Sequence, residues 1–235
     1  MTRVFIDTNI YLDLYDAGED PEAIFRDIGG LKSLLIFPDM VFDEFLRNRD
    51  GILDRAAGKV GNSGVGEMHP SFFVQQTQAF TSLETARDSY NHAIKDILDA
   101  INRIISNPEQ DPIYIALLQL YQDPDVIVIH RTADNLRHAE ERKLLGNPPG
   151  DVGAETIGDQ VIWEMLLAHG EDDLIVVTRD YTYKNHLFFL MREFREKTGH
   201  DLRVTEYLSE ALKEMGKSPS DSLTRFDEAW RMRGG

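Results

Sequence analysis

Cysteine is absent from the 235-residue chain, which excludes disulfide bonds and thiolate-ligated zinc sites. Long hydrophobic runs are absent too: the longest apolar stretches have the length of a β-strand, so we expect no membrane-spanning helix. The N-terminus has no charged region followed by a long apolar stretch, so we predict no secretory signal. We therefore expect a cytoplasmic protein with no membrane partner.

Basic residues are outnumbered by acidic ones, with 25 Lys and Arg against 41 Asp and Glu and a net charge of −16. A protein that simply binds nucleic acid is usually basic, because contacts to phosphates supply most of its affinity. This charge balance argues against a broad cationic surface. It remains compatible with an enzyme that gathers a few basic residues near one site.

Short apolar runs alternate with amphipathic segments along most of the chain. Strands are predicted at 3–6, 33–37, 126–129, 174–178 and 202–205, with helices between them. Strands separated by helices predict a parallel sheet. We therefore expect one α/β domain over residues 1–235, a three-layer α/β/α sandwich with a central, mainly parallel sheet.

The middle of the chain departs from this alternation, because residues 58–122 carry predicted helices but no strand. A long amphipathic helix is predicted over 75–106, where apolar residues recur at steps of four and three from Tyr90 onward, the spacing of a helix packed against other helices. We expect a helical insertion at about 58–122. A polar C-terminal tail is expected from about residue 218, with room for a last helix.

Two aspartates directly follow predicted buried strands. Asp7 follows the first strand, and Asp180 belongs to the turn after the fourth. Because the carboxyl ends of parallel strands share one edge of a sheet, where α/β proteins bind ligands, both acids are expected at that edge. Asp172 and Asp173 precede the fourth strand, which places them roughly 16 Å away at the opposite edge.

Two further acids lie near helix starts that face the same edge. Asp159 lies in the first turn of a helix expected to begin after Thr156, a candidate N-cap. Glu44 lies one turn into the helix that follows the second strand, where Asp39 is better explained as a cap. The apolar pattern does not choose between Asp43 and Glu44.

Four carboxylates that converge without basic partners repel one another, which raises their pKa values. Divalent cations relieve this repulsion, and hard oxygen ligands suit Mg²⁺ or Mn²⁺. Two such ions about 4 Å apart can activate water and stabilise a leaving oxygen in phosphodiester cleavage. The pattern therefore predicts a hydrolytic site that uses one or two divalent ions.

Basic residues flank these acids in the sequence and are candidates for binding the phosphates of a substrate. Arg142, Lys143 and Arg179 are the best candidates. Ordinary helix-surface charge is the alternative explanation for each of them. Tyr181 and Tyr183 could stack on bases, although a structural role is the simpler explanation.

Several of these segments together resemble the PIN domain. They are Asp7-Thr8-Asn9 after the first strand, an acid in the third helical region, Gly158-Asp159 at a late helix start, and Val177-Thr178-Arg179-Asp180 after the next strand. The loop Gly146-Asn147-Pro148-Pro149-Gly150 before the late helix resembles a larger bacterial PIN-like branch. The resemblance covers about 1–50 and 130–205.

The resemblance implies a Mg²⁺- or Mn²⁺-dependent nuclease that acts mostly on RNA. It implies a catalytic and metal-binding quartet of Asp7, Glu44, Asp159 and Asp180, which favours Glu44 over Asp43, with Asn9 and Thr178 in supporting hydrogen bonds. A DNA nuclease with the same site and a non-catalytic module that binds nucleic acid or protein are the alternatives. Proteins of this kind often form homodimers, and the helix at 75–106 would offer a surface unless it packs on its own domain.

Overall fold

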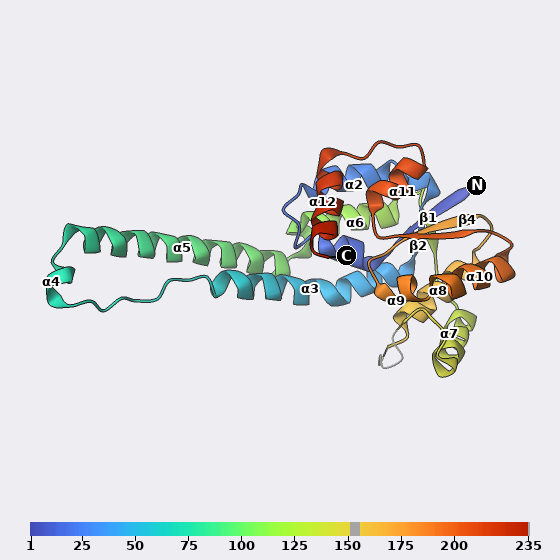
Figure 1. The fold of residues 1–235 in the computed structure, drawn as a ribbon, viewed down its shortest axis with the longest axis horizontal. Coiled ribbons are helices and arrows are strands. Elements are labelled where there is room, and N and C mark those ends of the chain that lie inside the picture. Colours follow the sequence, from blue (N-terminus) through green and yellow to red (C-terminus); the bar gives the residue numbers. More distant parts are fainter. Residues whose placement is uncertain (151–155, 235) are drawn as a thin grey trace. The chain divides into compact units, whose positions relative to one another are not determined.

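A computed structural model describes residues 1–150 and 156–234 of the chain (Figure 1). The chain divides into two compact units. Residues 1–48 and 112–235 form the first, which we call the sheet unit, and residues 49–111 form the second, which we call the helical unit. Among the described residues, no helix is both long enough and apolar enough to cross a membrane.

Parallel strands form the centre of the sheet unit. They are β1 (Thr2–Ile6), β2 (Ile36–Pro38), β3 (Ile127–Ile129), β4 (Asp173–Val177) and β5 (Leu202–Thr205). One sheet has the order β1-β4-β5, and β2 pairs separately with β3. A parallel bridge between Val4 and Leu35 brings the second pair beside β1. All five predicted strands are therefore present, and all their pairings are parallel.

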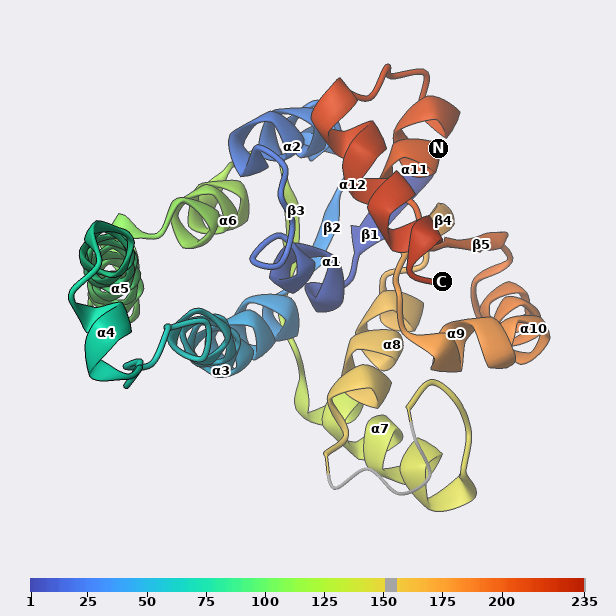
Figure 2. The ribbon, with the colours of Figure 1, turned by 60° about the vertical axis from the view of Figure 1, so that its left-hand side comes forward.

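Helices cover both faces of this sheet (Figure 2). On one side lie α2, α11 and α12, and on the other lie α8 and α10. This is the predicted three-layer α/β/α arrangement. The helices that lie wholly in the sheet unit are α1 (Thr8–Asp13), α2 (Pro21–Gly29), α6 (Pro112–Gln122), α7 (Ala133–Leu145), α8 (Gly158–Ala168), α9 (Tyr181–Asn185), α10 (Leu187–Thr198), α11 (Leu208–Glu214) and α12 (Asp221–Met232), with a 3₁₀ turn η1 (Lys32–Leu34). Residues 39–48, the first part of α3, also belong to this unit.

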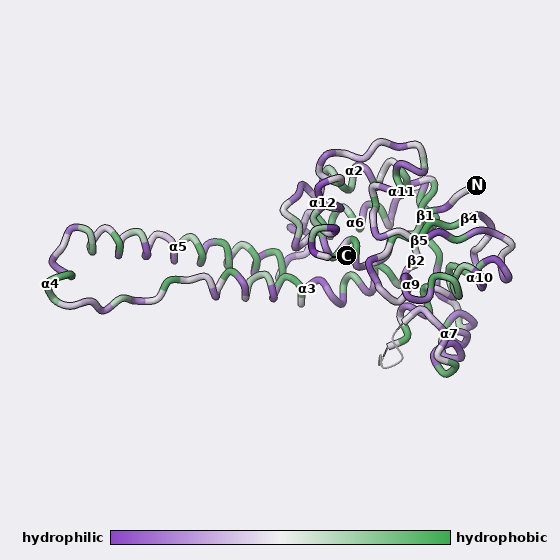
Figure 3. The backbone as a smooth tube through the Cα atoms, viewed as in Figure 1, coloured by the Kyte–Doolittle hydropathy of each residue, from purple (hydrophilic) through white to green (hydrophobic). Residues whose placement is uncertain are grey.

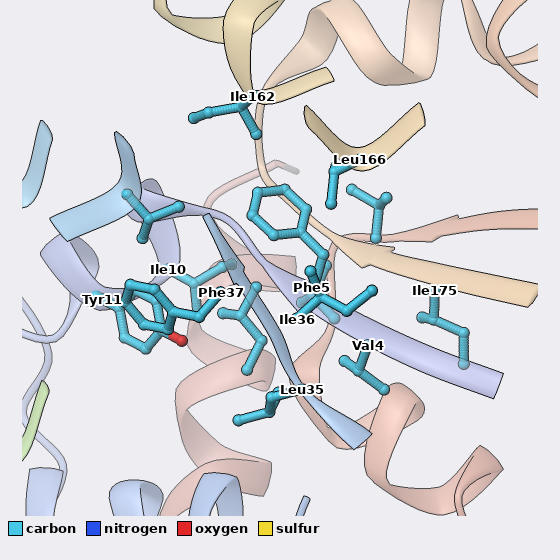
Figure 4. Packing of buried hydrophobic residues seen from close by; sticks show 14 of the residues in the cluster. Val4, Phe5, Ile10, Tyr11, Leu35, Ile36, Phe37, Ile162, Leu166 and Ile175 are labelled. Atoms are coloured by element: carbon cyan, nitrogen blue, oxygen red, sulfur yellow. The ribbon is translucent and has the colours of Figure 1, made fainter. Parts of the chain in front are cut away.

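The hydrophobic core lies between the strands and these helices (Figure 4). Val4 and Phe5 of β1 and Ile175 of β4 are fully buried, and Ile162 and Leu166 of α8 lie on the same side of the sheet as Phe5. Strands buried on both faces consist of continuous apolar residues rather than alternating ones. This explains why the short apolar runs in the sequence were sufficient to locate the strands.

The register of β1 against β4 fixes which acids share an edge. Ile6 pairs with Val177, and the backbone N–H of Asp7 donates to the Val177 carbonyl at 2.9 Å. The carboxyl ends of both strands therefore lie level with each other. Asp172 lies at the opposite end of the sheet, where it accepts from the Arg3 guanidinium at 2.9 Å, as the strand length predicted.

The helical unit contains the end of α3 (Asp39–Gly61), α4 (Phe72–Gln75), α5 (Gln78–Ser106) and the 3₁₀ turn η2 (Pro108–Gln110). The buried side chain of Arg49 connects the first residues of this unit with its last residues. Its buried guanidinium donates to Asp111 at 2.6 Å and to the Ile104 carbonyl at 2.7 Å. Leu53 of α3 and Ile94 of α5 are the buried apolar residues of this unit.

Three details differ from the predictions. The predicted insertion spanned 58–122, whereas the helical unit spans 49–111 and α6 packs against α2 in the sheet unit. The segment after 218 forms α12, because Leu223, Phe226 and Trp230 recur at helical spacing and Leu223 and Phe226 are buried. Thr156 is not the cap of α8, which begins at Gly158 with Ile157 in the N-cap position.

Candidate active site

Asp7 lies where β1 ends and α1 begins, and its carboxylate accepts hydrogen bonds from three donors. As the N-cap residue of α1 it accepts from the Thr8 backbone N–H at 2.7 Å. Its other oxygen accepts from the Asn9 amide at 2.6 Å and from the Thr178 hydroxyl at 2.5 Å. The structure thus places both predicted supporting residues, Asn9 and Thr178, in direct contact with Asp7.

Asp180 is the N-cap residue of α9, directly beyond β4. Its two oxygens accept from the Thr182 backbone N–H at 2.8 Å and from the Thr182 hydroxyl at 2.6 Å. Its own N–H donates to the Thr178 hydroxyl at 3.0 Å. Because that hydroxyl donates to Asp7, Thr178 links the two aspartates through one side chain.

Glu44 reaches the same place from α3. Its carboxylate accepts from the Thr8 hydroxyl at 2.9 Å, so it lies next to the residue that follows Asp7. Asp43 instead forms an ion pair with Arg131 at 2.6 Å, and Asp39 accepts from the Arg131 backbone N–H. Of the acids at the start of α3, Glu44 is therefore the one that the structure brings beside Asp7.

Asp159, the second residue of α8, completes the group. The pKa of the buried Tyr183 hydroxyl is raised well above its ordinary value. Burial is the largest cause, and the charges of Asp7, Asp159, Asp180 and Glu44 follow. All four acids thus lie within electrostatic reach of one side chain. Tyr183 packs edge-on against Trp163 of α8, with ring centroids 6.1 Å apart.

The pKa of the Asp7 carboxyl group is strongly raised. Burial raises its pKa from 3.8 to about 7, and the charges of Glu44 and Asp159 add to this effect, although the hydrogen bonds from Thr178 and Thr8 oppose it. Burial likewise raises the pKa of Glu44, and the charge of Asp180 adds to it. Mutual repulsion of these acids was the electrostatic consequence expected of a carboxylate cluster.

Asp7, Glu44 and Asp180 take part in no ion pair with Lys, Arg or His in the described part of the chain. Their donor chemistry, partly buried carboxylate oxygens that are not in an ion pair, fits a hard divalent ion. Within 1–150 and 156–234, however, no three Asp, Glu or His side chains converge as a formed metal site. Their oxygens accept from threonine hydroxyls, from the Asn9 amide and from backbone N–H groups.

A surface groove of about 230 Å³ opens beside Asp180. Thr178, Lys184 and Tyr207 contribute to its lining, together with apolar side chains from α10 and β5. A larger groove of about 470 Å³ between α2 and α6 contains none of the four acids. Of these two hollows, only the one beside Asp180 can present a bound molecule to the acidic group.

Arg142, one of the predicted substrate-binding residues, is buried. Its guanidinium donates to Glu164 and Glu193 at 2.6 Å each and to the Pro148 carbonyl at 2.6 Å. The ammonium of Lys143, by contrast, is near the surface and donates to the Thr156 carbonyl at 3.4 Å. The guanidinium of Arg142 is fully used inside the protein, so we do not retain it as a phosphate ligand.

Arg179, the other predicted arginine, is held by α12. Its side chain is 4% exposed and pairs with Asp13 at 2.7 Å and with Asp227 at 3.2 Å. Its guanidinium also lies over the rings of Phe226 and Trp230, 4.3 and 4.7 Å from their centroids. A substrate phosphate would have to displace these partners, so we interpret Arg179 as a structural cation.

Some residues of the site were missed in the sequence. The hydroxyls of Thr8 and Thr182 donate to Glu44 and Asp180, and the charges of all four acids raise the pKa of Tyr183. A hydroxyl one or two residues after each strand-end aspartate was the available signal for the two threonines. Tyr183 gave no signal of this kind, because only the fold brings it to the acids.

The sequence profile of the PIN domain matches residues 4–183, more than half of the chain. The matched region contains Asp7, Glu44, Asp159 and Asp180, as well as Asn9 and Thr178. No curated protein and no solved structure matches the chain. PIN domains are typically nucleases and generally use divalent metal ions. From its fold and from this match, the chain belongs to the PIN domain family.

Proposed function

We propose that this protein is a Mg²⁺- or Mn²⁺-dependent nuclease that hydrolyses phosphodiester bonds in RNA. The observation that carries this proposal is the set of hydrogen bonds from Thr8 and Thr178 that connects Asp7, Glu44 and Asp180 at one edge of the sheet. Asp159 adds to it, because its charge raises the pKa of Asp7. Buried carboxylates that raise one another's pKa values, as Asp7 and Glu44 do here with their neighbours, are costly to a folded protein unless a cation neutralises them. A structural role alone gives no reason to retain them.

Asp7, Glu44, Asp159 and Asp180 would hold the ion or ions. Bound there, divalent metal supplies Lewis acidity that lowers the pKa of water and neutralises the charge developing on the phosphate. The carboxylates must be ionised to bind it, so the raised pKa of Asp7 describes the metal-free site. Metal affinity is therefore expected to increase as the pH rises through about 7.

The hydroxyl and amide groups around the acids orient them. Thr178 and Asn9 fix one oxygen of Asp7, and Thr182 fixes both oxygens of Asp180. Groups that orient metal ligands typically contribute 10- to 100-fold in affinity or activity. We infer that these side chains hold the carboxylates close to their metal-bound positions while they still repel one another.

Arg47 is the basic residue best placed to meet a phosphate. It lies on the exposed side of α3, three residues beyond Glu44, and its charge lowers the pKa of that carboxyl. The groove beside Asp180 would accept a nucleotide next to the cleaved bond, with Tyr207 and Lys184 in its lining. A local cation of this kind fits a chain whose overall charge is strongly negative.

The test is cleavage of labelled single-stranded RNA and DNA of the same sequence, with Mg²⁺, with Mn²⁺ and with EDTA. The proteins are the wild type, Asp7→Asn, and Asp172→Asn as a control acid at the opposite edge of the sheet. We expect metal-dependent cleavage of RNA by the wild type and the control, and none by Asp7→Asn. Equal cleavage by Asp7→Asn would refute the site.

The same assay separates the alternatives. Cleavage of DNA alone would correct the substrate while leaving the acidic site in place. RNA binding without cleavage under every metal condition would refute the enzymatic proposal and favour a module that only binds nucleic acid.

A further inference from the structure

The helical unit has an uncovered apolar stripe along α5. Of its residues, Leu83, Tyr90 and Ile97 are 49%, 47% and 49% exposed, large values for side chains of this size. They lie seven residues apart, and Ile104, which is partly buried, continues the series at the end of the stripe. Figure 3 shows hydrophobic residues recurring along the length of α5. A seven-residue apolar repeat keeps these side chains on one face of the helix.

A different face of α5 is the one covered within its own unit. Ile94 is buried, and Leu98 lies 3.9 Å from the position that a Cβ on Gly61 would occupy. Asn91 bonds both the N–H and the carbonyl of Val65 at 2.9 Å. At 100° per residue, Tyr90 and Ile97 lie about 40–60° around the helix from Ile94, which leaves them beside the covered face.

Alanines complete the open stripe in a regular way. Ala79, Ala86, Ala93 and Ala100 also recur every seven residues, four before each large residue. Large and small side chains thus alternate at spacings of four and three over more than three heptads, a seam that specifies a partner helix. Small residues on such a seam let a second backbone approach closely.

We propose that this seam binds α5 of a second copy of the chain in antiparallel orientation. The alternation of large and small residues is self-complementary in one register. In this register, the two residue numbers of each facing pair sum to 183. Tyr90 of one copy then faces Ala93 of the other, and each large residue meets an alanine in every layer. The four facing pairs are Ala79 with Ile104, Leu83 with Ala100, Ala86 with Ile97, and Tyr90 with Ala93.

A parallel pair lacks this fit, because large residues would face their own copies and alanines would face alanines. Charges are also compatible with the antiparallel register. Bordering the open side of the seam are Ser82, Ser89, Asp96 and Arg103. In this register Asp96 faces Ser89 and Arg103 faces Ser82 of the other copy, so no like charges meet. A two-fold pairing of identical surfaces is the commonest symmetry of homo-oligomers.

The seam from residue 79 to 104 is about 38 Å long at 1.5 Å per residue. One helix from each copy gives a narrow interface, which we place at the small end of specific interfaces, below about 1,200 Å² in total. We therefore expect a reversible dimer whose fraction increases with concentration.

The first test is the mass in solution, measured by sedimentation equilibrium from low to high micromolar concentration. We expect the wild type to approach twice the chain mass of 26.8 kDa. Tyr90→Glu and Ile97→Glu should remain monomeric while keeping the wild-type helix content by circular dichroism. The matched control is Leu144→Glu, which changes an exposed apolar residue of α7 in the sheet unit and should dimerise as the wild type does.

The second test determines whether the two α5 helices pair in antiparallel orientation. Because the chain has no native cysteine, single cysteines can be introduced at chosen positions and crosslinked. Ala86→Cys and Ile97→Cys should be crosslinked by a short bis-maleimide only when the two variants are mixed. Efficient crosslinking of Ile97→Cys alone would indicate a parallel pair and overturn the proposed register. A wild type that stays monomeric throughout would overturn self-association and leave the seam to a helix of another protein. Neither test depends on nuclease activity.

Discussion

Two groups of carboxylates in the sheet unit differ in one respect, the presence of a cation. Glu164 and Glu193 share the guanidinium of Arg142 at 2.6 Å, whereas Asp7 and Glu44 accept hydrogen bonds from hydroxyl, amide and backbone donors and form no ion pair among the described residues. The pKa values follow this difference. Burial acts to raise the pKa of Glu193, but hydrogen bonds from Arg142 and Trp163 outweigh it and lower the pKa, whereas for Asp7 burial prevails.

Helix α8 contributes to both groups, with Asp159 in its first turn and Glu164 five residues later. Two acids on one helix thus have opposite roles in this account. Glu164 belongs to an ion-pair network that connects α7 and α10 to α8, and the charge of Asp159 raises the pKa values of Asp7 and Tyr183. The candidate site is therefore recognised by Asp7 and Glu44, whose pKa values are raised and which form no ion pair among the described residues, rather than by where acids are numerous.

The largest effect is expected from removing the cation of the paired group. Arg142→Met removes the buried cation of Glu164 and Glu193 and leaves them the more distant, exposed Lys197, which should lower the free energy of unfolding by about 3–5 kcal/mol. Urea denaturation followed by circular dichroism measures this loss. The double variant Arg142→Met/Glu164→Leu should recover part of it, and no recovery would show that the loss does not come from the unpaired carboxylate.

The next effect distinguishes two neighbouring acids of α3. Glu44→Gln should lower the rate of RNA cleavage by at least about 100-fold, because it removes a proposed metal ligand beside Asp7. Asp43→Asn should leave the rate within a few-fold, since Asp43 pairs with Arg131. Initial rates at saturating metal compare them, and the reverse ranking of the two variants would assign the site to Asp43.

A smaller effect concerns stability and pH in the metal-free protein. The pKa of Asp7 is about 7 in the folded state against 3.8 as its ordinary value, so the folded protein binds more protons between these pH values. Stability contributed by the protonated group is therefore lost as the pH rises from about 4 to about 7. Asp7→Asn should remove this decline and stabilise the EDTA-treated protein by about 2 kcal/mol at pH 8.

Thermal unfolding across this pH range measures the decline, with Asp172→Asn as the control. Asp172 pairs with Arg3 and the N-terminal amine, which lower its pKa, so its loss should destabilise the protein slightly at neutral pH. A pH profile of Asp7→Asn that parallels the wild-type profile would contradict the proposed source of the charge strain.

The smallest effect is expected from the exposed cation near the site. Arg47→Ala should weaken RNA binding by up to about 10-fold for all sequences. It should also reduce the slope of the logarithm of the binding constant against the logarithm of the salt concentration by about one. Arg192→Ala is the control, because Arg192 is exposed on α10 and pairs with Glu196. Fluorescence anisotropy at several salt concentrations tests this, and equal losses in both variants would mean that the effect is only one of net charge.

Much of the fold followed from local patterns in the sequence. The buried strands 3–6 and 174–178 were recognisable because strands covered on both faces are continuous apolar runs, and their ends then located Asp7 and Asp180. The profile match and the parallel sheet confirm the expected family and fold. The assignment of Asp7, Glu44, Asp159 and Asp180 as a catalytic quartet stays a prediction.

The arginines show where the sequence was insufficient. Arg142 and Arg179 lie close to predicted site residues in the chain, yet the fold turns them towards Glu164, Glu193, Asp13 and Asp227. Whether a cation faces a site or a buried carboxylate depends on contacts up to 166 residues apart, which local spacing does not encode. The partner of Arg179 in α12 lies beyond the region that the family profile matches.

Titration with Mn²⁺ by calorimetry at pH 7.5 tests the central claim most directly, because the proposed nuclease must bind a divalent ion through Asp7 and the acids near it. The wild type should bind one or two ions per chain, and binding should be lost in Asp7→Asn but unchanged in Asp172→Asn. Absence of binding by the wild type, or binding of equal strength by Asp7→Asn, would contradict the account.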